Sequence, residues 1–283
     1  MCIRDRVKES GTKKKVYGVD YVFSKENRAR LEKAGVKLFE CNLLDREAVA
    51  NHHRLHFRGP NLVAAVAGDI ESHNPADLLA ESLGQLPGGE PWTAPASSTH
   101  GDTTSEATLP KHQAAIAIAF PTGPAAAAEH PALELLHHHC ADMAGPLFTR
   151  IREELGLAYH VSAMRIPGFD AGTLVFFLAT SPDQAELAEN ALREEIAKLA
   201  EHGLDEKALE SCRNNTLSAL ALAAQSPGAM ARAAAIDTIL GLGPDHPQRY
   251  PDLLRQVTAD ELRTVAARIL SAQPAIARVN CTK

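Results

Sequence analysis

Residues 147–159 read LFTRIREELGLAY, a helical pattern that gives way within a few residues to a strand pattern. A helix is predicted over 146–155, because proline is favoured in a first turn and Gly156 supplies the stop signal after the last one. Arg152 falls in the last turn of this helix, and Tyr159 falls at the start of the next strand. The two side chains are therefore expected to project from one corner of the fold.

The flanking sequence predicts an α+β domain around this corner. Strands are predicted at 114–120, 158–164, 173–179 and 275–280. Helices are predicted at 129–141, 181–203 and 205–224 and from Thr258 onward, with capping residues at Ser181, Asp205 and Thr258. The apolar face of the helix after Ser181 is predicted to comprise Leu187, Ala188, Ala191, Leu192, Ile196 and Leu199. Because two of the strands are joined by a short turn and helices follow as a group, we expect an antiparallel sheet covered by helices on one face.

The first 107 residues divide into three parts of different character. Residues 1–42 are left unassigned: they carry only generic strand and helix signals, at 16–22, 24–34 and 36–39, and their first six residues, MCIRDR, resemble a translated sequencing adapter. The natural N-terminus is therefore expected to be missing. Residues 43–90 predict a helix at 45–57, a buried strand at 62–67 and a helix at 75–83. Residues 91–107 have the Pro, Ser and Thr content of a linker, which leaves 108–283 as a further domain.

The composition excludes several classes of protein. With 45% hydrophobic and 23% charged residues, the 283-residue chain has enough apolar content for a core, which excludes long disorder. A net charge of −6 with dispersed Lys and Arg argues against a nucleic-acid partner. No apolar run approaches the roughly 20 residues of a spanning helix, so no membrane span is expected. The five dispersed cysteines predict free thiols.

The thirteen histidines do not form a zinc-peptidase motif in the sequence. Such a motif needs two histidines four residues apart with a glutamate between them, and the pair His52 and His56 has no glutamate between its members. Residues 137–139 are three histidines, and Glu134 precedes His137 by three positions. Consecutive helical residues point about 100° apart, so three adjacent histidines cannot converge on one ion. We therefore predict that this chain binds no metal.

Motifs of other enzyme classes are also absent from the sequence. No G-x-S-x-G elbow, P-loop or G-x-G-x-x-G follows a predicted strand, so hydrolase-triad, phosphate and dinucleotide sites lack their anchors. Cys140 follows the three histidines, but its neighbours face different directions, which favours a buried inert thiol. On this basis no catalytic residue is assigned.

The segment 147–159 resembles the L-F-x-x-I-R-E-x-x-G-L-A-Y signature in the second domain of pitrilysin/insulinase-like zinc peptidases, the group that includes the mitochondrial processing peptidases. The flanks agree, because residues 58–69 resemble the strand that closes the first domain of this family. Residues 86–89, 203–206 and 257–261 resemble later parts of its pattern. The resemblance covers 43–283, so 43–90 is expected to be the tail of a first peptidase-like domain and 108–283 a complete second one.

The resemblance implies a fold of paired α+β domains around a chamber. In this family the first domain carries the zinc helix His-x-x-Glu-His, which this sequence lacks. The second domain supplies an arginine and a tyrosine seven positions apart, which correspond to Arg152 and Tyr159 as a substrate-binding and oxyanion pair. A guanidinium can donate a fork of hydrogen bonds to peptide carbonyls, and a phenol can donate to the developing oxyanion. Without the resemblance, Arg152 would be assigned to a surface ion pair and Tyr159 to an ordinary strand position.

Taken together, the sequence predicts a substrate-positioning C-terminal fragment of a zinc metallopeptidase subunit. Zinc is expected in the complete enzyme and not in this chain, which alone should be inactive. The expected partners are a peptide substrate and either the missing N-terminal domain or a homologous zinc-bearing subunit, in a dimer. The alternative is a non-catalytic, peptide-binding partner subunit of a heterodimeric peptidase, whose own first domain never had the zinc helix. A purely structural subunit is disfavoured because Arg152 and Tyr159 are both present.

Overall fold

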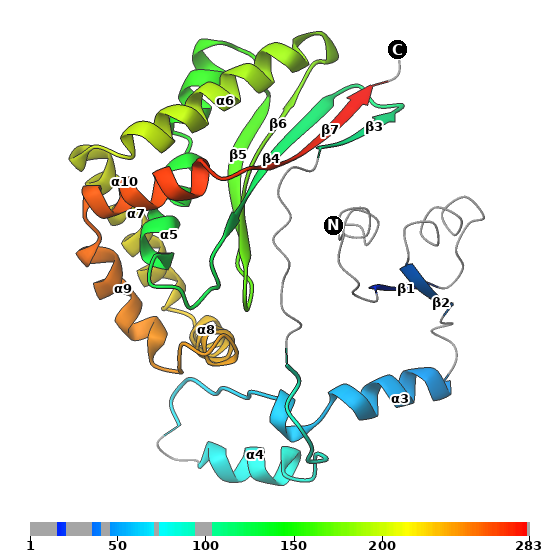
Figure 1. The fold of residues 1–283 in the computed structure, drawn as a ribbon. Helices are drawn as coiled ribbons and strands as arrows, with labels where there is room; N and C mark the ends of the chain where they lie inside the picture. The colour runs from blue at the N-terminus through cyan, green and yellow to red at the C-terminus, as the bar shows by residue number, and fades with distance from the viewer. Residues whose placement is uncertain (1–15, 21–35, 41–45, 71–73, 94–103, 282–283) are drawn as a thin grey trace. The chain divides into compact units, whose positions relative to one another are not determined.

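The computed structural model describes residues 16–20, 36–40, 46–70, 74–93 and 104–281, the first two ranges by their backbone only. The chain divides into two compact units, 1–64 with 69–100 and 65–68 with 101–283. Figure 1 shows the elements of both units, which we describe separately.

The smaller unit contains a two-stranded sheet and two α-helices among its described residues. The strands β1 (Val16–Asp20) and β2 (Val36–Glu40) pair in parallel, close to the two predicted strands; the helix predicted between them lies outside the described residues. The helices are α3 (Arg46–His56) and α4 (Pro75–Leu83). Asn74 caps α4 by accepting a hydrogen bond from the Ala76 amide, which confirms the predicted start of that helix.

The prediction of a strand at 62–67 is wrong. These residues follow a single 3-10 turn, Gly59–Asn61, and belong to no sheet. Their exposure alternates between exposed and half-buried along the segment, as in an extended chain. The apolar run satisfies the sequence pattern of a buried strand, but no partner strand is present beside it in the described part of the chain.

The larger unit is built on a five-stranded sheet with the strand order β3-β7-β4-β6-β5. Its strands are β3 (Thr104–Leu109), β4 (Ala114–Thr122), β5 (His160–Ile166), β6 (Gly172–Thr180) and β7 (Ala275–Cys281). The pairs β4–β6, β5–β6 and β4–β7 are antiparallel, as predicted, whereas β3 joins β7 in parallel. The sheet is therefore mixed rather than purely antiparallel.

The strand β3 begins inside the segment 91–107 that was predicted to be a linker. All six of its residues are exposed, so it carries no alternating hydrophobic pattern by which the sequence could reveal it. The side chains that attach it are polar. The Arg278 guanidinium on β7 donates a hydrogen bond to the Glu106 carboxylate on β3 at 3.0 Å and two more to the Glu189 carboxylate on the helix Ala185–His202.

Helices cover one face of this sheet (Figure 1). They are α5 (His130–Ala141), α6 (Ala185–His202), α7 (Glu206–Ala223), α8 (Pro227–Ile239), α9 (His246–Gln256) and α10 (Ala259–Leu270). A π-helix, Leu147–Glu154, connects α5 to β5. The α+β class and the one-sided helical cover are confirmed.

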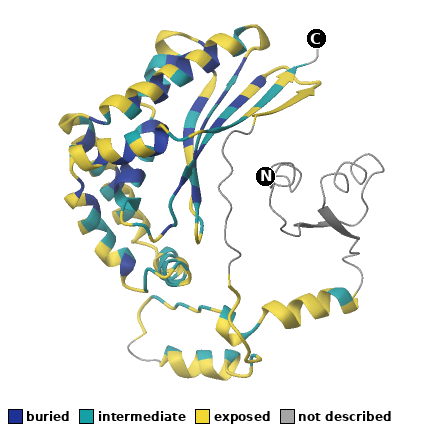
Figure 2. Cartoon of the chain, viewed as in Figure 1, coloured by how far each residue is buried: buried dark blue, intermediate teal, exposed yellow. Residues whose placement is uncertain are grey.

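The core lies between the sheet and the helices, as the dark blue residues of Figure 2 show. Alternate residues of β4 and β6 are buried, and Phe120 meets Phe176 edge to face at 5.9 Å between ring centroids. The helix caps predicted at Asp205 and Thr258 are confirmed by their hydrogen bonds to backbone amides.

Two details of α6 differ from prediction. Ser181 accepts no capping bond, because a 3-10 turn, Pro182–Gln184, precedes the helix and the Ser181 hydroxyl donates to Gln184 instead. Leu187, which was assigned to the buried face, is 60% exposed. The turn shifts the start of the helix and leaves the buried face to the other five predicted residues, Ala188, Ala191, Leu192, Ile196 and Leu199.

Candidate functional site

The corner that carries Arg152 and Tyr159 is held by an unusual helix end. The amide of Leu155 donates to the Arg150 carbonyl at 3.1 Å, an i→i−5 bond that gives the segment its π-helical form. Gly156 then takes a φ of +63°, and the next amide, that of Leu157, donates to the Ile151 carbonyl at 2.9 Å. Such π-helical turns are rare and occur frequently at functional sites.

The base of this corner is packed tightly into the core. Leu147 and Ile151 are 0% exposed, and Leu157 and Ala158 are buried behind them. The Thr180 hydroxyl, at the end of β6, donates to the Leu157 carbonyl. The backbone on both sides of the glycine is therefore fixed, which keeps the exposed side chains above it in a defined position.

Above this base, the Arg152 guanidinium lies over two aromatic rings. Its Cζ atom is 4.6 Å from the centroid of the Phe148 ring and 5.2 Å from that of the Tyr159 ring. Both separations are within the range of a cation–π interaction. The structure therefore brings the two predicted site residues together, with Tyr159 one position before β5 and 75% exposed.

The neighbouring Arg150 shows how Arg152 differs from an ordinary surface arginine. Arg150 pairs with Glu154 one helical turn away at 2.8 Å, a typical exposed ion pair. In the described part of the chain, Arg152 has neither an ion pair nor a hydrogen bond, and it is half-buried and in contact with both rings. No carboxylate among the described residues therefore forms the surface ion pair that was the alternative role for Arg152. Its guanidinium N–H groups can donate to an acceptor from outside the domain.

A second polar cluster lies on α5, where the sequence predicted no metal site. Glu134, His137 and His138 place one potential ligand atom each within 4.8 Å of one another. Glu134 Oε1 lies 3.0 Å from His138 Nε2, and its other carboxylate oxygen pairs with Arg165 on β5. His139 is outside the cluster, as the divergence of adjacent helical residues predicts, whereas His137, His138 and Glu134 share one face of the helix.

The charges around this cluster are set by burial and by Arg165. Burial alone would raise the pKa of Glu134, but the hydrogen bond with His138 and the Arg165 guanidinium lower it to about 2. Burial and the same guanidinium lower the pKa of His130 to about 4, and burial also lowers that of His137. Arg165 Nη1 donates to His130 Nε2 at 2.6 Å, which requires that imidazole nitrogen to be unprotonated.

The remaining candidates from the sequence do not form sites among the described residues. His52 and His56 lie on α3 with ring centroids 4.4 Å apart and no third ligand beside them. The Cys140 thiol is buried, and burial raises its pKa above the usual range, as is typical of an inert structural cysteine.

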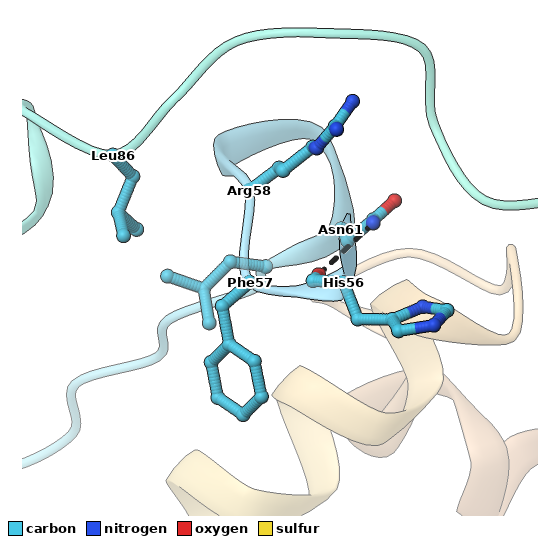
Figure 3. Close-up of a pocket in the computed structure, with 6 residues that line it drawn as sticks. His56, Phe57, Arg58, Asn61 and Leu86 are labelled. Carbon is cyan, nitrogen blue, oxygen red and sulfur yellow. Dashed lines mark hydrogen bonds between the residues drawn. The ribbon is translucent and has the colours of Figure 1, made fainter. Parts of the chain in front are cut away.

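Figure 3 shows a pocket lined by His56, Phe57, Arg58, Asn61, Leu62 and Leu86. Its volume of ≈ 190 Å³ is below the range of about 300–1,000 Å³ that is usual for ligand sites. The Asn61 amide donates to the His56 carbonyl at 3.0 Å and so closes the loop that forms the pocket. The pocket is therefore not the candidate site.

Comparisons with known proteins identify the family of the chain. The family model described as the peptidase M16 inactive domain matches residues 44–216. An uncharacterized zinc protease of Streptomyces coelicolor is 23% identical over 256 residues, covering 86% of this chain and 55% of that protein. An uncharacterized zinc protease of Rickettsia bellii is 38% identical over 81 residues, which are 29% of this chain and 19% of that protein. No helix among the described residues is both long and apolar enough to cross a membrane.

Solved structures share the fold. The crystal structure of a peptidase M16 inactive domain from Pseudomonas fluorescens superposes with a TM-score of 0.76 at 16% identity, covering 86% of this chain and 58% of that one. An inactive peptidase domain from Bordetella parapertussis gives a TM-score of 0.54 at 19% identity, over 61% of this chain and 96% of that one. The chain thus spans little more than half the length of the Streptomyces and Pseudomonas proteins.

A five-stranded mixed sheet with one helical layer is the fold that this chain shares with the solved peptidase M16 inactive domains. The chain belongs to the peptidase M16 family, which its family model matches over 44–216. This finding confirms the resemblance to the pitrilysin/insulinase-like zinc peptidases.

Proposed function

We propose that this chain is the non-catalytic half of a zinc metallopeptidase and that it positions peptide substrates through Arg152 and Tyr159. The catalytic half would be a further domain of the same protein or a homologous partner subunit. The main observation in support is that Arg152 contacts two rings while its guanidinium pairs with no other group among the described residues.

The stacking of Arg152 suits a substrate-positioning role. The rings of Phe148 and Tyr159 restrict the guanidinium, so little rotamer freedom would be lost when it binds a ligand. Peptide carbonyl oxygens are acceptors that can receive its N–H groups while the rings keep its plane in place. Lysine would retain the charge at this position but would lose both the fork of donors and the stacking.

The Tyr159 hydroxyl suits a contact with the reacting carbonyl. Because the side chain is 75% exposed, its phenol can reach a group supplied from outside the domain. A donor placed at a developing oxyanion contributes about 3 kcal/mol to transition-state stabilisation where one has been removed in other enzymes. In this proposal Tyr159 supplies that donor across the chamber from the zinc-bearing half.

The catalytic metal itself has no place in this chain. The sequence contains neither His-x-x-Glu-His nor His-Glu-x-x-His, and the α5 cluster has its glutamate ahead of both histidines. In a complete enzyme, zinc would polarise the peptide carbonyl and activate a water molecule. This chain would bind and orient the peptide, and the assembly would be a dimer of halves.

The experiment is a kinetic comparison in the assembled enzyme, either the full-length gene product or the complex with its zinc-bearing subunit. Tyr159→Phe keeps the ring under Arg152, so we expect kcat to fall about 10²-fold with little change in melting temperature. Arg152→Lys is expected to raise KM at least as much as it lowers kcat.

The matched control is Arg150→Lys, which changes the ion-paired arginine on the same helix. We expect this variant to leave both kinetic constants within about twofold of wild type. Near-normal kcat and KM for Tyr159→Phe and Arg152→Lys, with lowered melting temperatures, would refute the proposal and assign both residues to structure alone.

A further inference from the structure

Two buried side-chain polar atoms lack a hydrogen-bond partner in the described part of the chain, and both belong to residues on which the Glu134 carboxylate acts. They are His137 Nδ1 and Tyr250 Oη. The Glu134 carboxylate acts electrostatically on both groups, and the Tyr250 ring packs against those of His130 and His246. A buried polar atom without a partner is rare in proteins, and an unseen ion or water is one of its standard explanations.

The side chains around these atoms are those that bind zinc. Glu134, His137 and His138 occupy positions i, i+3 and i+4 of α5, which place them on one face of the helix. Their ligand atoms lie within 4.8 Å of one another. Tetrahedral zinc, with ligands at about 2.0–2.2 Å, separates ligand atoms by roughly 3.3 Å. Side-chain rotations that close the group by about 1.5 Å would thus complete three ligand positions.

Contacts behind the cluster orient its members toward this centre. The backbone of Ala163 on β5 interacts with the His137 imidazole, whose Nδ1 atom has no hydrogen-bond partner in the described part of the chain. Glu134 is held through one oxygen by Arg165, which leaves the other directed at His138. A backbone carbonyl behind a histidine and a hydrogen bond behind a carboxylate are the supporting contacts that metal ligands usually have.

We propose that Glu134, His137 and His138 form a binding site for one divalent transition-metal ion of the zinc class, separate from the catalytic zinc of the peptidase family. The donor set of two imidazoles and one carboxylate is one of those that bind zinc in proteins, and a fourth position stays open for water. This site revises the expectation that the chain binds no metal.

The positive charge of Arg165 does not preclude such a site. The guanidinium neutralises Glu134, so the three ligands and Arg165 together carry no net charge before the metal binds. Sets of three neutral histidines bind zinc in other proteins, which shows that a net negative charge is not required. The hydrogen-bonded network alone accounts for Glu134 and His138, but it leaves His137 Nδ1 without a partner.

The site can be reached from solvent on the His138 side. The His138 side chain is 38% exposed. It also lines a pocket of ≈ 130 Å³ together with Ala141, Asp142, Cys212 and Asn215, on the surface between α5 and α7. A metal ion can therefore exchange without unfolding of the domain.

The test is a zinc titration of the full chain after removal of metals with a chelator, in competition with a chromophoric zinc indicator. We expect one equivalent of zinc to bind, with an affinity at least tenfold lower in His138→Gln and in His137→Gln. His139→Gln is the matched control, because it removes the adjacent histidine outside the cluster and should leave the affinity unchanged. His52→Gln tests the exposed pair on α3 and should also leave it unchanged.

A second measurement does not depend on any variant folding. In the wild-type chain, zinc should protect His138 from modification by diethyl pyrocarbonate, as read by tandem mass spectrometry. The proposal is overturned if no equivalent of zinc binds, if His137→Gln and His138→Gln bind as tightly as wild type, or if zinc leaves the modification of His138 unchanged.

Discussion

Acidification from pH 7 to pH 5 in the presence of a chelator is expected to destabilise the larger unit through His130. In the folded protein, burial and Arg165 lower the pKa of this imidazole from 6.5 to about 4. The unfolded chain therefore binds more protons than the folded one between these two values. By linkage, the stability contributed by the neutral imidazole is complete above pH 6.5 and is lost as the pH falls toward 4.

The magnitude follows from the two pKa values. At pH 5 roughly 97% of the unfolded-state imidazole is protonated, against about 10% in the folded state, which corresponds to about 2 kcal/mol. Because the side chain is not fully removed from solvent, we expect a loss of about 1–2 kcal/mol in the free energy of unfolding. The lowered pKa values of His137 and His139 add to this loss in the wild-type chain with the same sign.

The assay is urea unfolding at pH 7 and pH 5, followed by far-UV circular dichroism. His130→Gln removes the titration while its side-chain oxygen can still accept the hydrogen bond from Arg165. The pH-dependent loss should therefore be smaller by about 1–2 kcal/mol in this variant. His112→Gln, at an exposed position, should behave as wild type. An equal pH-dependent loss in His130→Gln and wild type would refute the reasoning.

Two further predictions concern the backbone. Gly156 and Gly203 both have a φ of +63°, but an added Cβ meets nothing within 4 Å at Gly156, whereas at Gly203 it would lie 2.9 Å from the Arg263 Cα. Gly156→Ala should lose only about 1–2 kcal/mol of stability and Gly203→Ala clearly more, and the opposite order of melting temperatures would contradict this reasoning. Removal of β3 exposes the edge of β7, so the segment 110–283 should self-associate more than 101–283 in light scattering; equal association would contradict this role of β3.

Local chemistry made much of the fold predictable. The helix starts at Asn74, Asp205 and Thr258 were correct because each side chain caps its own helix within three residues, a contact that the sequence alone specifies. The strands β4 and β6 were correct because burial on alternate residues leaves a readable pattern.

Other elements were missed because their stability comes from distant residues. The strand β3 is fully exposed and is held by pairing with β7, 172 residues further along the chain at the Glu106–Arg278 contact. The helix α8 has no buried residue, so no amphipathic face marked it. The run 62–67 has a strand pattern without a partner strand among the described residues.

The candidate site was predictable in part. The helix–glycine–strand pattern placed Arg152 and Tyr159 at one corner, and the structure brings the guanidinium to 5.2 Å from the ring. Phe148 lies four positions before Arg152, a spacing that places both side chains on one face of a helix, but their contact was not predicted. In the sequence, Glu134 precedes His137 by three positions, but no metal site was predicted there. The structure adds His138, four positions after Glu134, whose potential ligand atom lies within 4.8 Å of the other two.

Peptidase activity measured with and without the zinc-bearing half tests the central claim most directly. The chain alone, supplied with zinc, should not cleave an unstructured peptide, even when metal is bound at the α5 cluster. Addition of the zinc-bearing half should give chelator-sensitive cleavage that falls about 10²-fold when this chain carries Tyr159→Phe. Chelator-sensitive cleavage by the purified chain alone, abolished by His138→Gln, would contradict the account and make this domain catalytic in its own right.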